Sequence, residues 1–82
     1  MIHWVYLLRS IPFPDKVYVG CTKDLDQRLA QHQAGADGGY AAKYGPWKVV
    51  VAIQFDDRVK AEKFERYVKS GSGQSFARRH FW

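Results

Sequence analysis

The chain has 82 residues, of which 46% are hydrophobic and 16% aromatic, so we expect residues 1–82 to fold as a single domain with a modest core. Cys21 is the only cysteine, which excludes an internal disulfide, and the three histidines show no spacing typical of structural zinc. The sequence has no signal-peptide pattern and no apolar run long enough for a membrane span, which predicts a soluble, cytoplasmic protein.

The formal net charge of +5 is concentrated in the C-terminal part of the chain. Up to Asp57, six Lys and Arg balance six Asp, whereas from Arg58 onward seven Lys and Arg face only Glu62 and Glu65. A basic segment with interleaved aromatic residues favours a polyanionic partner such as nucleic acid. Solvated lysines also keep small domains soluble, so charge alone does not decide between the two interpretations.

Two apolar segments near the start of the chain are predicted to form a β-hairpin. Residues 2–9 alternate between two faces, one with Trp4, Tyr6 and Leu8, the other with Val5 and Leu7. Residues 10–16 contain two prolines, which cannot continue a central strand, and residues 17–21 are then expected to return antiparallel. Tyr6 and Tyr18 would therefore lie on neighbouring strands and share a face.

A helix is predicted over residues 24–33, directly after the second strand. Asp24 has the side chain of an N-cap, and Gly20 in the preceding strand is typical of a close approach by a ligand or another part of the backbone. Arg28 and His32 lie one turn apart at the edge of the apolar stripe. They either form a solvated helix edge or point into a cleft shared with the strand.

The middle of the chain predicts a loop followed by a third strand. Residues 34–39 are rich in glycine but show no phosphate-binding motif, and they are interpreted as a loop. Residues 46–55 form a nearly continuous apolar run, which favours the centre of the sheet with both faces covered.

The C-terminal part predicts two helices. The first covers residues 58–69 and is capped by Asp56 or Asp57, and a short final helix begins at Ser72 or Gly73 and runs to Arg79. Phe76, Phe81 and Trp82 are expected to dock this last helix, with stacking on a nucleic-acid base as the alternative for Trp82.

Glu65 is placed at the edge of the buried stripe of the helix over residues 58–69. A carboxylate in such a position needs a partner. Lys69, four residues on, would provide an ordinary helical ion pair, whereas a metal ion would provide a functional one.

Two triplets, WVY at residues 4–6 and YVG at 18–20, precede Arg28 and Glu65 in an order and spacing that resemble the GIY-YIG nuclease family. The resemblance covers residues 2–69 and is greatest to small stand-alone members similar to the nuclease domain of the excinuclease C subunit. It implies an α/β fold in the order ββαβα. A small, mainly antiparallel, three-stranded sheet is then flanked by helices, with a short extra C-terminal helix.

The same resemblance implies roles for five side chains, which we expect to surround one concave surface. Glu65 would bind Mg²⁺ or Mn²⁺, and Arg28 would stabilise the transition state at the scissile phosphate. Tyr6 or Tyr18 would orient or deprotonate the water, and His32, where many members have tyrosine, would relay protons. A single carboxylate suits one hydrated ion better than a two-metal site.

The leading hypothesis is therefore a metal-dependent DNA endonuclease of low sequence specificity, acting on DNA that includes branched or damaged forms. The alternatives are a catalytically weak nucleic-acid-binding module and a partner-dependent subunit of a repair or mobile-element complex. The chain contains no asparagine, so Gln74 or a serine of residues 70–73 would replace the asparagine that many members place after the metal ligand. The predicted nucleic-acid-binding residues are Lys23, Lys43, Lys69, Arg78 and Arg79.

Overall fold

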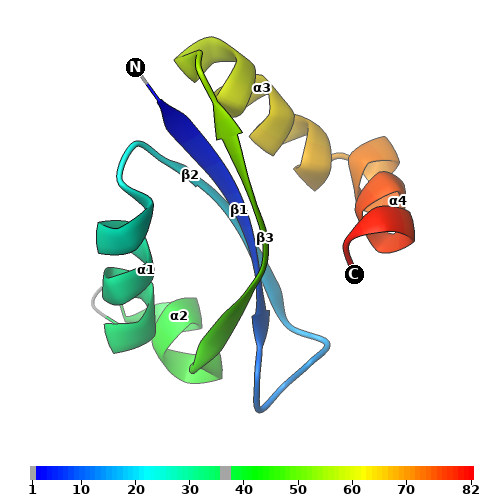
Figure 1. Ribbon diagram of the computed structural model, residues 1–82. Coiled ribbons are helices and arrows are strands. Elements are labelled where there is room, and N and C mark those ends of the chain that lie inside the picture. The colour runs from blue at the N-terminus through cyan, green and yellow to red at the C-terminus, as the bar shows by residue number, and fades with distance from the viewer. Residues whose placement is uncertain (1, 36–37) are drawn as a thin grey trace.

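A computed structural model of the chain, described for residues 2–35 and 38–82, contains a three-stranded antiparallel sheet (Figure 1). The strands are β1 (His3–Ser10), β2 (Val17–Thr22) and β3 (Trp47–Phe55), in the spatial order β2-β1-β3. The register places Tyr6 of β1 opposite Gly20 of β2 and Ala52 of β3. Within the described residues, no helix is long and apolar enough to cross a membrane.

The prediction that residues 46–55 form the centre of the sheet is wrong, because β3 is an edge strand and β1 lies in the middle. Val49 of β3 is 46% exposed, whereas Val5 and Leu7 of β1 are fully buried. A continuous apolar run shows that a strand meets hydrophobic neighbours, but it does not say on how many sides strands pair with it. The central place goes to β1, which pairs with β2 on one side and with β3 on the other.

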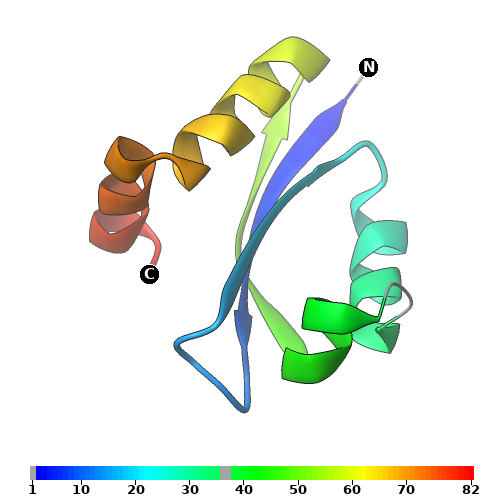
Figure 2. The ribbon, with the colours of Figure 1, turned by 180° about the vertical axis from the view of Figure 1, so that it is seen from behind.

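Helices cover both faces of the sheet, with α1 and α2 on one side and α3 and α4 on the other (Figures 1 and 2). Their bounds are α1 (Leu25–Ala34), α2 (Gly39–Tyr44), α3 (Arg58–Lys69) and α4 (Gly71–His80). The α/β class, the antiparallel sheet and the extra C-terminal helix expected from the sequence are confirmed.

The alternation predicted for β1 divides the hydrophobic core into two layers. Tyr6 and Leu8 pack with Trp47 on the side of α1 and α2. Val5 and Leu7 pack on the opposite side, with Ala61 and Val68 of α3 and Ala77 of α4. Because successive side chains of a strand point to opposite faces, β1 contributes to both layers at once.

Side-chain caps set the starts of three helices. The Asp24 carboxylate accepts a hydrogen bond at 3.1 Å from the backbone N–H three residues on, as predicted for α1. Asp57, rather than its neighbour, caps α3 by accepting from the Val59 N–H at 2.8 Å. The Ser70 hydroxyl accepts from the Gly73 N–H at 3.2 Å, so α4 begins slightly earlier than predicted.

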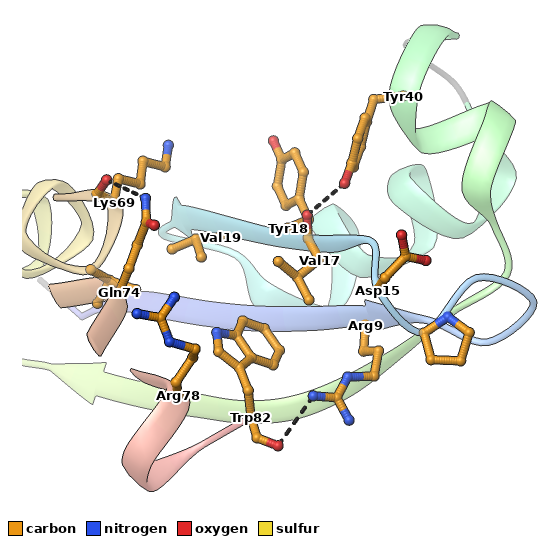
Figure 3. Close-up of a pocket in the computed structure, with 12 residues that line it drawn as sticks. Arg9, Asp15, Val17, Tyr18, Val19, Tyr40, Lys69, Gln74, Arg78 and Trp82 are labelled. Carbon is orange, nitrogen blue, oxygen red and sulfur yellow. Dashed lines mark hydrogen bonds between the residues drawn. The ribbon is translucent and has the colours of Figure 1, made fainter. Parts of the chain in front are cut away.

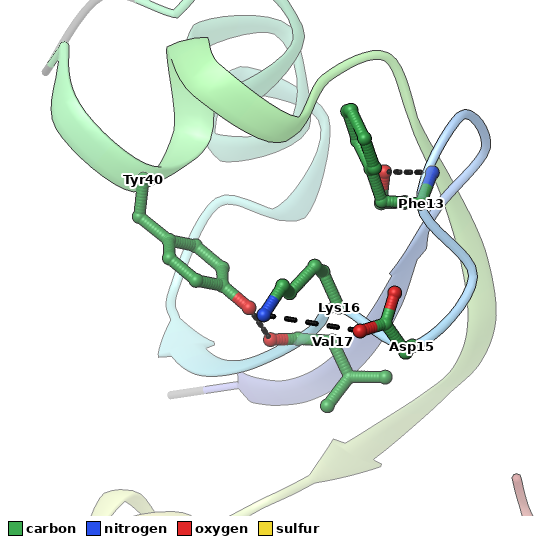
Figure 4. A network of polar contacts seen from close by, with 6 residues as sticks. Phe13, Asp15, Lys16, Val17 and Tyr40 are labelled. Atoms are coloured by element: carbon green, nitrogen blue, oxygen red, sulfur yellow. Dashed lines mark hydrogen bonds and ion pairs between the residues drawn. The ribbon is translucent and has the colours of Figure 1, made fainter.

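The short helix α2 is absent from the sequence prediction, since six residues are too few to show helical periodicity. Gly35 ends α1 in the left-handed conformation, with φ of 66°. The loop predicted over residues 34–39 includes residues 36–37, which lie outside the described residues. The Tyr40 hydroxyl of α2 donates a hydrogen bond to the Val17 carbonyl at 2.9 Å (Figure 4), and this bond ties α2 to the start of β2.

Candidate active site

A cleft of about 620 Å³ opens at the β2 edge of the sheet. Arg28 of α1 and Glu65 of α3 both line it, although their helices pack on opposite faces of the sheet. Cys21 and Thr22, at the end of β2, form part of the wall between them. Because β2 is an edge strand, side chains from both faces can reach a common cleft beside it. The structure therefore brings the predicted arginine and glutamate together.

Tyr6 is fully buried next to this cleft, and Gly20 makes room for its ring. A Cβ atom on Gly20 would overlap the Tyr6 hydroxyl, which is the close approach that the strand glycine predicted. Arg28, Tyr18 and Glu65 are near enough to influence the ionisation of the Tyr6 hydroxyl. Both the ring and the hydroxyl are therefore buried, and the hydroxyl adjoins the candidate site through Arg28.

The environment of the Tyr6 hydroxyl strengthens its preference for the neutral form. Burial, followed by the neighbouring Tyr18, raises the pKa of Tyr6 to about 12, and Arg28 opposes the rise. The buried oxygen makes no hydrogen bond of good geometry with the described residues, although the Arg28 side chain lies close enough to lower the pKa of Tyr6 through a hydrogen-bonding interaction. At neutral pH this tyrosine therefore offers a proton to an incoming acceptor and is a poor base.

The other two predicted ring residues, Tyr18 and His32, pack under α1 and do not line this cleft. His32 is buried, whereas Tyr18 is half-buried and lines a second cavity beside β2. The rings of Tyr18 and Tyr6 stack with their centroids 6.2 Å apart. Tyr18 also contacts His32 at 4.4 Å, and the buried His32 packs against Trp47 at 5.0 Å. The structure thus joins Tyr6, Tyr18 and His32 into one aromatic chain, while Arg28 lines the cleft itself.

Both glutamates of α3 line the cleft and form ion pairs within the helix. Glu65 accepts a hydrogen bond from the Lys69 ammonium at 3.1 Å, the ordinary pair that the sequence offered as its alternative to a metal ion. Glu62 pairs with Arg58 at 3.2 Å. The sequence analysis missed Glu62 and His3, which also line the cleft. The three-residue spacing from Glu65 was the available signal for Glu62.

The donor atoms of the cleft fit a hard divalent cation. Carboxylate oxygens are the ligands that Mg²⁺ and Mn²⁺ prefer, and Mg²⁺ commonly keeps several waters with one or two carboxylates. No group of three or more His, Cys, Asp or Glu side chains able to hold a metal occurs in the described part of the chain. The arrangement suits a hydrated ion on one glutamate. Burial raises the pKa of the Cys21 thiol, which disfavours the thiolate as an additional ligand.

The predicted nucleic-acid-binding residues fall into three places. Lys23 lines the cleft. Lys69 and Arg78 line a second cavity beside β2, together with Gln74, whose amide donates to the Lys69 carbonyl at 3.0 Å. Lys43 and Arg79 are exposed, on α2 and α4 respectively.

The chain matches the family described as the GIY-YIG catalytic domain over residues 2–79. It belongs to this family. The fold agrees with the assignment, because the solution NMR structure of the UPF0213 protein BH0048 from Bacillus halodurans aligns with a TM-score of 0.55 at 29% identity. That alignment covers 93% of this chain and 81% of the other. The expectation of a GIY-YIG enzyme domain of the nuclease class is confirmed at the level of the family.

Several curated relatives are similar to this GIY-YIG domain. The structure-specific endonuclease subunit SLX1 of Candida dubliniensis is 40% identical over 67 residues, covering 74% of this chain and 23% of the relative. SLX1 of Kluyveromyces lactis is 41% identical over 66 residues, with 73% and 23% covered. The UPF0213 protein BH0048 of Halalkalibacterium halodurans is 32% identical over 69 residues, with 84% and 71% covered. The chain thus spans less than a quarter of the length of these fungal relatives.

Proposed function

We propose that the chain forms one catalytic domain that hydrolyses phosphodiester bonds in DNA with a divalent metal ion and low intrinsic sequence specificity. The observation that carries the proposal is the meeting of Arg28 and Glu65 in one cleft, from helices on opposite faces of the sheet. The fungal relatives are structure-specific endonuclease subunits by name, which supports a substrate recognised by its structure rather than by its base sequence.

Arg28 and Glu65 divide the charge chemistry of the cleft. The planar guanidinium of Arg28 binds two phosphate oxygens and offsets the negative charge of the transition state. Glu65 holds the metal ion, which when bound acts as a Lewis acid and activates water. The Lys69 pair on Glu65 is a partly exposed helical ion pair, worth about 0.2–0.5 kcal/mol, so it gives way readily to a divalent cation.

Tyr6 and Tyr18 take different roles in this proposal. Tyr6 remains protonated at neutral pH, so it donates a hydrogen bond to the attacking water or to a phosphate oxygen. Tyr18 would then accept the water proton while its own hydroxyl proton passes to His32, whose ring it contacts. Histidine side chains can take up and release protons, so we assign His32, which is buried between Tyr18 and Trp47, as the next group in this relay.

Cleavage of supercoiled plasmid and of labelled branched and single-stranded oligonucleotides, with Mg²⁺ or Mn²⁺, tests the proposal. We expect Glu65→Ala and Arg28→Ala each to lose about 100-fold or more in rate, as when a transition-state contact is removed. EDTA should abolish cleavage. Arg66→Ala is the matched control, since Arg66 is exposed on α3 and is not one of the residues that line the cleft.

Glu62→Ala tests which glutamate binds the metal ion, independently of whether the protein is a nuclease. If it abolishes cleavage while Glu65→Ala does not, the metal ligand is Glu62 and the nuclease proposal stands. Wild-type protein that cleaves none of the substrates, yet binds DNA in a salt-dependent manner, would contradict autonomous catalysis.

That second outcome would favour a subunit that needs a larger protein partner, the candidate supported by the word subunit in the names of the fungal relatives. Addition of such a partner should then restore metal-dependent cleavage, and Glu65→Ala should abolish it again.

A further inference from the structure

A second cavity, of about 740 Å³, follows the catalytic cleft along β2 (Figure 3). The cleft is bordered by residues 21–22 of β2 and by Glu65 of α3, whereas the second cavity is bordered by residues 17–19 of β2 and by Lys69 of α3. The two cavities therefore lie in sequence beside the same strand and the same helix. We call the second one the side groove, and its principal residues are Arg9, Tyr18, Tyr40, Lys69, Arg78 and Trp82.

Aromatic rings are held in place within the side groove. The Arg9 guanidinium lies 5.4 Å from the centre of the Trp82 ring and donates a hydrogen bond to the Trp82 carbonyl at 3.2 Å. Tyr40 lies on the other side of β2, where it is anchored by its hydrogen bond to the Val17 carbonyl (Figures 3 and 4). Because these contacts already restrict the rings, stacking of a flat ligand on them costs less conformational entropy.

The charged residues of the side groove complement a phosphate backbone. Arg9, Lys69 and Arg78 face a single lining carboxylate, that of Asp15. Figure 3 shows Arg78 and Trp82 reaching from the C-terminal end of the chain toward β2. Cationic side chains combined with fixed aromatic rings are the two features that single-stranded nucleic acid requires, because its bases expose their faces for stacking.

We propose that the side groove binds unpaired nucleotides of the DNA strand that enters the catalytic cleft, with a base stacked on Trp82 and phosphates near Lys69 and Arg78. Tyr18 of the groove and Thr22 of the cleft are four positions apart on β2, which corresponds to about 13 Å, so the groove and the cleft are separated by the length of a few nucleotides. A continuous duplex cannot use this groove, because its base faces are already stacked on each other. The inference rests on the proposed nuclease function and specifies its substrate as DNA with an unpaired segment.

The test compares binding of a labelled blunt duplex with binding of the same duplex carrying a single-stranded oligothymidine tail. Fluorescence anisotropy in EDTA measures binding without cleavage, and wild-type protein should bind the tailed duplex more tightly. Trp82→Leu keeps an apolar side chain against the core but removes the ring, and it should reduce the preference for the tail at least about fivefold. Trp82→Phe should retain most of it. Tyr67→Leu is the matched control, as an exposed aromatic of α3 outside the groove residues.

Charge variants give an independent measurement. Arg78→Gln should weaken binding to the tailed duplex and lower its salt dependence, whereas Arg66→Gln, which removes an exposed arginine of α3 outside the groove, should have a smaller effect. Thermal unfolding verifies that each variant is folded.

The outcomes separate this inference from the proposed function. Equal affinity of wild-type protein for blunt and tailed duplexes overturns the side groove, even if the protein cleaves DNA. Equal tail preference in Trp82→Leu and wild type also overturns it. Loss of the preference in Trp82→Leu, with retention in Trp82→Phe and Tyr67→Leu, supports the groove whether or not cleavage is observed.

Discussion

Replacing Tyr6 by phenylalanine should stabilise the protein while impairing its chemistry. The Tyr6 hydroxyl is buried and makes no hydrogen bond of good geometry with the described residues, so the hydration that it loses on folding is replaced only by its interaction with Arg28. An unsatisfied buried polar group costs about 1–3 kcal/mol, and Tyr6→Phe removes that cost without removing the ring. We therefore expect the free energy of unfolding to rise by about 1 kcal/mol, the lower end of that range.

Thermal and urea unfolding at neutral pH measure this change. For a chain of this length, a gain of about 1 kcal/mol raises Tm by roughly 4–8 °C. Tyr40→Phe is the matched control, because its hydroxyl donates a hydrogen bond at 2.9 Å, and its removal should lower stability by about 0.5 kcal/mol or more. The two Tyr→Phe substitutions are thus expected to have opposite signs.

A Tyr6→Phe variant that is less stable than wild type by about 1 kcal/mol would refute the reasoning. It would mean that the hydroxyl is well satisfied in the folded protein, with Arg28 as the nearest donor. Cleavage assays on the same variant address the function, since loss of the proton donor should slow the reaction even though the fold is more stable. This combination is typical of a polar group retained for catalysis.

Four further changes test other features of the structure. Gly20→Ala forces the Tyr6 ring out of place and should cost about 1–3 kcal/mol, measured by urea unfolding. Gly73→Ala should be at least as damaging, because its Cβ would overlap backbone atoms at the end of α3. Lys69→Met should change stability by less than about 0.5 kcal/mol, since its pair with Glu65 is partly exposed. The free energy of unfolding should fall as the pH rises above 10, because the pKa of Tyr6 is about 12 in the folded protein but 10.0 ordinarily, so the unfolded chain loses this proton first. The fall should be smaller by about 2–3 kcal/mol in Tyr6→Phe, which has no hydroxyl at this position.

Local signals in the sequence predict much of the secondary structure. Asp24 and Asp57 each cap a helix through a hydrogen bond to a backbone N–H two or three residues on, so the starts of α1 and α3 depend on neighbours in the sequence. The alternation around Tyr6 and Val5 likewise predicts two faces for β1, because the geometry of a strand requires it. The family can also be identified from the sequence, because the order and spacing of the two triplets, Arg28 and Glu65 form a linear pattern.

The relations between distant segments come from the tertiary structure alone. The apolar run ending near Phe55 predicts a central strand, but the central strand is β1, because β1 is hydrogen-bonded to β2 on one side and to β3 on the other. Glu62 becomes a cleft residue only when α3 packs beside β2. The raised pKa of Tyr6 likewise requires burial by residues far from it in the chain.

The sequence by itself determined the helix starts, the alternation of the strands and the family, because each depends on residues that are close in the chain or arranged in a linear motif. Only the tertiary structure decided which strand is central, that side chains from opposite faces meet at the β2 edge, and that the pKa of Tyr6 is raised. These features depend on long-range packing and on the exclusion of water, which no local pattern in the sequence specifies.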